Sequence, residues 1–234
     1  MSEASTLPRY SYADLPGLLA LMSGDEKHDP ASESTLDVIW VLYDRVLRVS
    51  PRPETAGSES RDRFYLSKGH GPMAYYAVLT AKGFISADEL PRFGQFDSLL
   101  GLHPDRNLVP GAEISSGSLG HGLPLAVGTA LGLRAMGLTG DRVFVLTGDG
   151  ELDEGSGHEA IAFASRAGLE ALHCVVVDNA SASYGWPGGI EIRFAAEGWS
   201  AARVDGRDHA ALEAALTTPH PGRPHAVVAV IEPA

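Results

Sequence analysis

The 234-residue sequence is poor in cysteine and holds only Cys174. A single cysteine forms no internal disulfide bond, and it makes no cysteine cluster for zinc. Because three valines follow Cys174 directly, the sequence predicts a buried and unreactive thiol. Disulfide-stabilised folds and cysteine-based zinc folds are therefore excluded within this chain.

Positive charge is also scarce. The chain carries 18 Lys and Arg residues against 30 Asp and Glu residues, so its formal net charge is -12 with neutral histidines. Such a surface repels nucleic-acid phosphates and anionic lipids, and no local run of Lys or Arg offsets this repulsion. We therefore expect neither nucleic-acid binding nor membrane-surface binding.

Long apolar runs are missing as well. The first residues, MSEASTLPRYSYADLPG, are acidic and lack the apolar core of a secretory signal, and no later stretch is long enough to cross a bilayer. We expect a cytoplasmic protein. Residues 1–16, which contain Pro8 and Pro16, are expected to form a flexible lead, and residues 17–234 a single domain.

Helical patterns are present in the first half of the chain. Apolar residues recur at helical spacing from Leu36 to Leu47, which predicts a helix that starts near Ser34 and ends near Ser50. Ser34 and Asp37 are expected to form a capping pair at its start. A Gly-rich turn followed by MAYYAVLTAKG predicts a second helix that ends at Gly83.

A third helical segment is rich in glycine. In SSGSLGHGLPLAVGTALGLRAMG, three glycines recur at helical spacing: Gly120, Gly128 and Gly132. Each glycine costs about 1 kcal/mol in a helix interior relative to alanine. We therefore expect this helix to pack closely against another backbone, such as that of a partner subunit.

Apolar runs predict three buried strands, at residues 143–146, 174–177 and 227–231, and a helix over residues 156–167. Near-continuous apolar strands that alternate with helices indicate a parallel sheet. The predicted fold class is therefore α/β, with a parallel sheet covered by helices on both faces.

Polar residues stand where two of these strands end. Asp149 lies between Gly148 and Gly150 after one strand, and Asn179 follows another. Ligands of open parallel sheets bind beyond the carboxyl ends of the strands, and carboxylate and amide oxygens suit Mg2+. The two glycines let the backbone approach a diphosphate that shares the metal. Taken singly, each motif is more often a plain turn or a helix cap.

The combination resembles thiamine-diphosphate enzymes, because GDGELDEG, a helix, a second strand and VDNASASYG follow in that order. YLSKGHGPMAYY, GLHPD and GAEISSGSLGHGL are similar to three further motifs of transketolases. EGWSAARVDGRDHAALEAAL is similar to the strand, turn and helix that precede their last strand. From about residue 34 to residue 231, the chain resembles the N-terminal, diphosphate-binding domain of transketolase, in the stand-alone form of two-gene enzymes.

The resemblance implies a set of site residues. The implied Mg2+ ligands are the side chains of Asp149 and Asn179 and the backbone carbonyl of Ser181. The implied cofactor contacts are His70, Gly117, Ser118, Leu119, Gly150 and Asn179. The implied catalytic histidines are His70, His103 and His28. Glu154 resembles the glutamate that reaches across the subunit interface of the family.

The sequence departs from the family at two histidines and at its end. His28 lies in EKHDPASES, which lacks the glycines of the usual G-H-P-G segment, so a solvated loop histidine is an open alternative. His121 replaces the usual glutamine. After VVAVIEPA, no sequence follows for the domain that holds the aminopyrimidine ring. We expect a separate, C-terminal transketolase-like subunit to carry that domain, with which this chain forms a heterotetramer.

The function implied by the resemblance is transfer of a two-carbon ketol unit from a ketose, in phosphorylated form, to an aldehyde acceptor. Two alternatives stay open. One is a subunit of another thiamine-diphosphate enzyme, of the 2-oxoacid decarboxylase or dehydrogenase type, against which SKGHGP and GLHPD argue. The other is a non-catalytic, regulatory paralogue, against which the retained Asp149, Asn179, His70 and His103 argue.

Overall fold

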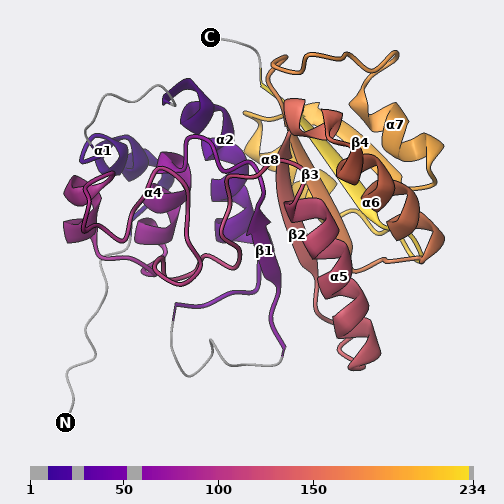
Figure 1. Cartoon of the computed structure of the whole chain (residues 1–234), viewed down its shortest axis with the longest axis horizontal. Helices are drawn as coiled ribbons and strands as arrows, with labels where there is room; N and C mark the ends of the chain where they lie inside the picture. The colour runs from indigo at the N-terminus through magenta and orange to yellow at the C-terminus, as the bar shows by residue number, and fades with distance from the viewer. Residues whose placement is uncertain (1–9, 23–28, 52–59, 232–234) are drawn as a thin grey trace.

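The computed structural model describes residues 10–22, 29–51 and 60–231. A five-stranded, all-parallel sheet in the order β1-β2-β3-β5-β4 forms its centre (Figure 1). The strands are β1 (Arg63–Leu66), β2 (Val143–Gly148), β3 (Leu172–Asp178), β4 (Ser200–Asp205) and β5 (His225–Val230). Because all strands run in the same direction, their carboxyl ends share one edge of the sheet.

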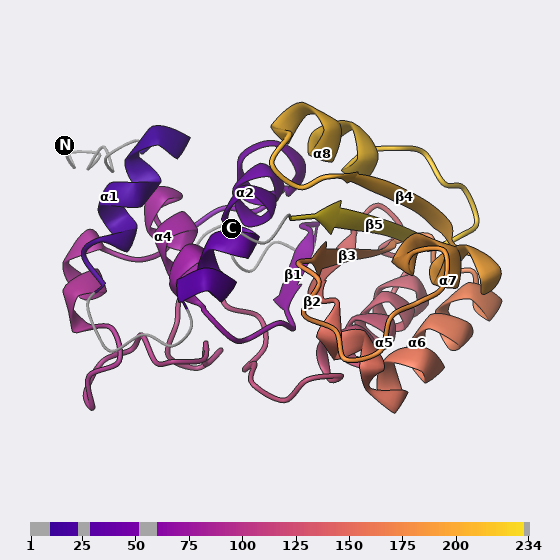
Figure 2. The ribbon, with the colours of Figure 1, turned by 90° about the horizontal axis from the view of Figure 1, so that it is seen from above.

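Helices connect the strands. They are α1 (Leu15–Leu19), α2 (Asp29–Val41), α4 (Met73–Ala81), α5 (Gly122–Ala135), α6 (Gly155–Arg166), α7 (Ile190–Ala196) and α8 (His209–Leu216). Short helical turns are η1 (Tyr12–Asp14), η2 (Leu42–Val46), η3 (Ala87–Arg92) and η4 (Gly150–Asp153). Figure 2 shows α2 and α8 on one face of the sheet and α5, α6 and α7 on the other.

Two apolar layers, one on each face, hold the sheet. Phe144 and Leu146 of β2 belong to the cluster shared with α2, α4 and α8, whereas Val143 and Val145 belong to the cluster shared with α5 and α6. All residues of β2 are buried, as a strand covered on both faces requires. The predicted α/β fold with a doubly covered parallel sheet is confirmed.

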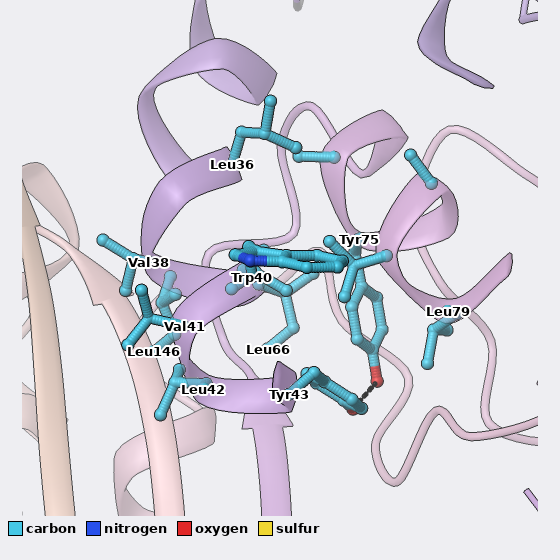
Figure 3. Packing of buried hydrophobic residues seen from close by; sticks show 14 of the residues in the cluster. Leu36, Val38, Trp40, Val41, Leu42, Tyr43, Leu66, Tyr75, Leu79 and Leu146 are labelled. Carbon is cyan, nitrogen blue, oxygen red and sulfur yellow. Dashed lines mark hydrogen bonds between the residues drawn. The ribbon is translucent and has the colours of Figure 1, made fainter. Parts of the chain in front are cut away.

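The helix predicted from Ser34 starts earlier than expected. α2 begins at Asp29, and Ser34 and Asp37 are both buried within it, so they form no cap at its start. The helix continues as the π-type turn η2 and ends at Val46 rather than near Ser50. Figure 3 shows Trp40 of α2 packed in the apolar cluster.

Residues 10–16 pack on the rest of the described chain. Leu15 is fully buried, and the Tyr12 hydroxyl donates a hydrogen bond of 2.6 Å to Oδ1 of Asp37. Two further residues bind the Asp37 carboxylate, each at 2.7 Å: Arg207, which precedes α8, and His209, which is the first residue of α8. Asp37 therefore ties η1 to α2 and α8.

The glycines behave differently from one another. Gly83 ends α4 with a φ of 81°, as predicted. Gly120 precedes α5, with a φ of 78°, and is not part of the helix. Gly128 and Gly132 lie inside α5, where a Cβ atom added to either would meet nothing within 4 Å. These two glycines therefore face open space in the described part of this chain. Among the helices of that part, none is long and apolar enough to span a bilayer.

Candidate active site

Asp149 stands at the carboxyl edge of the sheet, directly after β2 and at the start of η4. Because Gly148 pairs with Val177 across β2 and β3, the Asp149 amide donates to the Val177 carbonyl at 3.0 Å. The Asp149 side chain is 3% exposed. The strand register thus fixes a buried carboxylate at the edge where ligands of such sheets bind.

The loop after β3 closes around this carboxylate. The amides of Ser181 and Ala182 donate to Oδ2 of Asp149 at 2.7 and 3.0 Å, and the Ser181 hydroxyl donates to Oδ1 at 2.7 Å. The Ser181 carbonyl oxygen lies 3.7 Å from an ideal Cβ built on Gly150. The structure therefore brings Asp149, Gly150 and Ser181 together, as expected. The Ser181 atoms bound to Asp149 are its amide and hydroxyl, whereas the family resemblance implies its carbonyl as the ligand.

Asn179 lies in the same loop. Its Oδ1 atom is buried and accepts no hydrogen bond from the residues that the structure describes. The next residue, Ala180, has a φ of 57°, a conformation that costs a non-glycine residue about 1 kcal/mol or more. Asn179 stands two residues before Ser181, which is bound to the Asp149 carboxylate. An amide oxygen and a carboxylate oxygen are ligands that fit Mg2+.

Two histidines meet beside this edge. The rings of His70 and His103 have centroids 5.2 Å apart and are nearly perpendicular. A Cβ built on Gly69 would lie 2.8 Å from the Gly117 amide nitrogen, so the two loops touch through their backbones. His103 packs on both glycines, and its Nε2 atom is buried without a hydrogen-bond partner among residues 10–22, 29–51 and 60–231. Three loops far apart in the sequence thus converge here.

A buried lysine, Lys68, and a second carboxylate, Glu151, also lie at this edge. Lys68 is buried, and its side chain packs 3.3 Å from a Cβ built on Gly148. Burial lowers the pKa of Lys68 to about 8, although the carboxylates of Asp149 and Glu151 act to raise it. Burial raises the pKa of Glu151, against the hydrogen bonds that it accepts from Ser67 and Gly120.

A cavity of about 280 Å³ opens beside η4, on the side of α7. Its lining includes Asp149, Asp153, His158, Tyr184, Trp186 and Arg193. Arg193 of α7 is buried and donates to the Leu152 carbonyl at 2.8 Å, so α7 holds η4 in place. The turn that follows Asp149 is therefore fixed by the sheet at one end and by α7 at the other.

A family model described as the transketolase, thiamine diphosphate binding domain matches residues 20–230. The chain belongs to the transketolase family. Ferredoxin fas2 of Rhodococcoides fascians is 56% identical over 222 residues, which are 95% of this chain and 72% of that relative. An apulose-4-phosphate transketolase subunit of Actinobacillus succinogenes is 35% identical over 209 residues, which are 86% of this chain and 75% of that relative.

Solved transketolases share the fold. Transketolase from Leishmania mexicana matches with a TM-score of 0.78 and 25% identity over 95% of this chain. The chain spans 37% of the length of that structure. The sheet and its helices are therefore those of a thiamine-diphosphate-binding domain of the transketolase family.

Most of the remaining residues expected at this transketolase-family site are exposed to solvent. Ser118 and Leu119 are exposed next to Gly117, and Glu154 is exposed at the start of α6. His121, which replaces the usual glutamine, is exposed and bound through Nδ1 to the Leu119 carbonyl at 3.2 Å. His28 lies outside the described residues.

Sequence reasoning missed three polar residues of the site: Ser67, Lys68 and Glu151. All three stand inside the quoted transketolase motifs, next to residues that were assigned. The sequence did contain a signal for Lys68 and Glu151: one motif of the site holds a lysine and another a glutamate. Opposite charges in two motifs that form one site often lie close together. Their burial, however, follows only from the packing of the loops.

Proposed function

We propose that this chain is the N-terminal subunit of a split transketolase-like enzyme. With a partner that carries the pyrimidine-binding domain, it transfers a two-carbon ketol unit from a ketose, in phosphorylated form, to an aldehyde acceptor. The observation that carries this proposal is the buried Asp149 carboxylate at the carboxyl edge, together with the buried amide oxygen of Asn179, which lacks a hydrogen-bond donor in the described ranges. Membership of the transketolase family supports it.

The residues of this chain take distinct parts in the proposal. Asp149, Asn179 and the Ser181 carbonyl bind Mg2+, and Gly150 and Asn179 contact the diphosphate. Thiamine diphosphate, when bound, provides the carbanion chemistry of the reaction.

The loops on the other side complete the proposed site. Gly117, Ser118 and Leu119 line the cofactor. His70 and His103, whose rings lie 5.2 Å apart, orient the substrate and exchange protons with its oxygens. His28 is a further candidate for substrate contact in the family pattern.

A partner subunit is part of the proposal because the chain spans about a third of a transketolase and is similar to a protein named as one subunit of such an enzyme. The outer side of α5 offers a surface for it. Leu125 is exposed on this helix and Met136 directly after it, and Gly128 and Gly132 leave open space between them. We propose a heterotetramer of two copies of this chain and two partner copies, with Glu154 at the interface.

One relative is named a ferredoxin, but this chain lacks the residues that would hold an iron–sulfur cluster. Iron–sulfur clusters of ferredoxins are held by several cysteine thiolates, whereas this chain has Cys174 alone. Cys174 is fully buried in β3, and burial raises its pKa to about 12, so it is an inert thiol. Electron transfer through such a cluster is therefore not proposed for these 234 residues.

Reconstitution tests the function. The chain, a transketolase-like pyrimidine-domain subunit encoded beside it, and their mixture are each supplied with Mg2+, thiamine diphosphate, a ketose phosphate and an aldose phosphate. We expect ketol transfer in the mixture alone. Release of carbon dioxide from a 2-oxoacid instead would favour the decarboxylase alternative, and a mixture that binds cofactor without any turnover would favour the regulatory paralogue.

Assembly is tested on the same samples by light scattering. The mixture is expected to elute as a heterotetramer. Gly128→Trp places a bulky side chain on the outer side of α5 and is expected to weaken association and activity together, while circular dichroism stays unchanged. Arg134→Ala, on the same helix, is the control, because Arg134 already donates to the Ala167 carbonyl within the chain. A Gly128→Trp complex of normal size would contradict this interface.

A further inference from the structure

Glu151 is a buried carboxylate that has no role so far, either in binding the metal or in catalysis by the histidines. Its side chain is 4% exposed, and its Oε2 atom has no hydrogen-bond partner among the residues that the structure describes. A buried polar atom left without a partner costs about 1–3 kcal/mol, so such a residue is rarely kept for packing alone. The other oxygen, Oε1, shows what the residue does.

Oε1 joins two loops to the turn that carries Asp149. It accepts a hydrogen bond from the Ser67 hydroxyl, in the loop that leads to His70, and one of 2.9 Å from the Gly120 amide. The Ser67 oxygen in turn accepts the Gly122 amide at 2.9 Å. One carboxylate oxygen and one hydroxyl therefore connect the loop after β1, the loop before α5 and the turn after β2.

The same segments are packed so tightly that they require glycine. A Cβ built on Gly122 would lie 2.2 Å from the Ser67 hydroxyl oxygen. One built on Gly120, whose φ is 78°, would lie 2.7 Å from Cβ of Glu154. The Gly120 carbonyl is also bound, because it accepts the Ser156 hydroxyl at 2.7 Å. Both peptide groups of Gly120 are thus fixed between η4 and α6.

We propose that Glu151 is a positioning residue of the cofactor site. Through Oε1 it holds the Ser67 loop and the Gly120 loop on the Asp149 turn, so that His70, the loop of residues 117–119 and the metal ligands keep one geometry. This inference rests on the proposed function. Glu151 acts through the loops, and its effect falls on the binding of the cofactor rather than on the chemical step.

The test compares Glu151→Ala with Glu151→Gln in the complex with the partner subunit. The glutamine keeps an oxygen that accepts from Ser67 and Gly120, whereas alanine leaves both donors unpaired. With saturating Mg2+, we expect Glu151→Ala to raise the KM and the Kd for thiamine diphosphate about tenfold or more, since two charge-assisted hydrogen bonds are lost. Glu151→Gln is expected to stay within about threefold of the wild type, and kcat at saturating cofactor to change little in both variants.

Two further variants keep the test sharp. Ser67→Ala removes one of the two donors and is expected to raise the KM for the cofactor several-fold, with little added effect in the Glu151→Ala background because both changes break one link. Asp62→Asn alters a buried carboxylate at the opposite edge and is expected to lower the Tm without changing the Kd for the cofactor. If Glu151→Ala does not fold, Ser67→Ala alone decides the result.

The outcomes separate two failures. A wild-type complex that binds no thiamine diphosphate would overturn the proposed function, and the inference with it. A wild-type complex that binds the cofactor, together with a folded Glu151→Ala or Ser67→Ala variant that binds it equally well, would overturn the inference alone. So would a Glu151→Gln variant as impaired as Glu151→Ala, because the charge and not the hydrogen bonds would then matter.

Discussion

At the amino edge of the sheet, Asp62 is fully buried and both of its oxygens accept hydrogen bonds from arginines, Arg48 and Arg142. Burial acts to raise the pKa of Asp62, but these hydrogen bonds lower it to about 2. At the carboxyl edge, Glu151 is buried to a similar degree, yet burial raises its pKa and one oxygen has no partner in the described ranges.

The two buried carboxylates therefore differ in how completely their oxygens are paired. A carboxylate that is paired on both oxygens, like Asp62, stabilises the folded chain. Buried atoms without a hydrogen-bond partner among the described residues occur at both edges, on Glu151, Asn179 and His103 at the carboxyl edge and on Asp141, His173 and His225 at the amino edge. What sets the carboxyl edge apart is its place in the fold, because ligands of open parallel sheets bind beyond the carboxyl ends of the strands.

The strongest way to break this comparison is at Asp149. Asp149→Ala removes a hard oxygen ligand without opening the apolar core, so Mg2+-dependent binding of thiamine diphosphate is expected to fall below detection while circular dichroism stays the same. Asp178→Asn is the matched control, because Asp178 also ends a strand but pairs with Arg203 at 3.4 Å. Wild-type turnover in Asp149→Ala would refute the metal assignment.

The amino edge is expected to respond in the opposite way. Asp62→Asn leaves two guanidinium groups without their counter-charge and is expected to lower the free energy of unfolding by about 3 kcal/mol. Cofactor affinity of the folded variant should not change. Urea unfolding and calorimetry measure the two quantities, and a variant with normal stability and weakened cofactor binding would reverse the distinction between the edges.

The histidines sharpen the account of the carboxyl edge. His70→Ala and His103→Ala are each expected to lower kcat about a hundredfold, the usual contribution of a positioned acid or base. His28→Ala is expected to have a small effect. Steady-state kinetics with saturating cofactor measure the change. If His28→Ala were the most damaging of the set, the EKHDP loop would be part of the catalytic apparatus.

A smaller effect concerns pH at the amino edge. Burial, then the nearby His220 and His225, lower the pKa of His173 well below its usual value, so the folded chain keeps this ring neutral. The unfolded chain takes up a proton below about pH 6.5, and stability is therefore full above that pH and falls below it. One histidine contributes a slope of at most about 1.4 kcal/mol per pH unit.

Unfolding by urea from about pH 7.5 to about pH 5.5 measures this slope before carboxylates titrate. His173→Phe preserves the stacking on Phe144, whose ring centroid lies 4.3 Å from that of His173, and should flatten the curve. An unchanged slope would show that another group carries the pH dependence.

The sequence predicted those parts of the fold that rest on continuous apolar runs. The central strands β2, β3 and β5 are completely or almost completely buried, so their residues alone revealed them. β1 has four residues and was missed, and β4 is a half-exposed edge strand that only the resemblance to transketolases implied. The true start of α2 was missed because its capping signal at Ser34 lies inside the helix.

The residues of the candidate site also fall into those that local sequence patterns reveal and those that they do not. The position of Asp149 and Asn179 at the carboxyl edge was predictable, because each follows a continuous apolar strand. Glu151 was not, because its contact with Ser67 joins residues 84 positions apart and depends on how two loops pack. Local patterns reveal the ligands of such a site, whereas the residues that position them follow from long-range packing.

Titration of thiamine diphosphate in saturating Mg2+, followed by calorimetry, tests the central claim most directly. It is carried out on this chain alone and on its mixture with the pyrimidine-domain subunit. If the chain provides the diphosphate half of a shared site, binding is expected to be weak for the chain alone and at least about tenfold tighter in the mixture, an added 1.4 kcal/mol or more. Equal, full-affinity binding to the isolated chain would contradict the account.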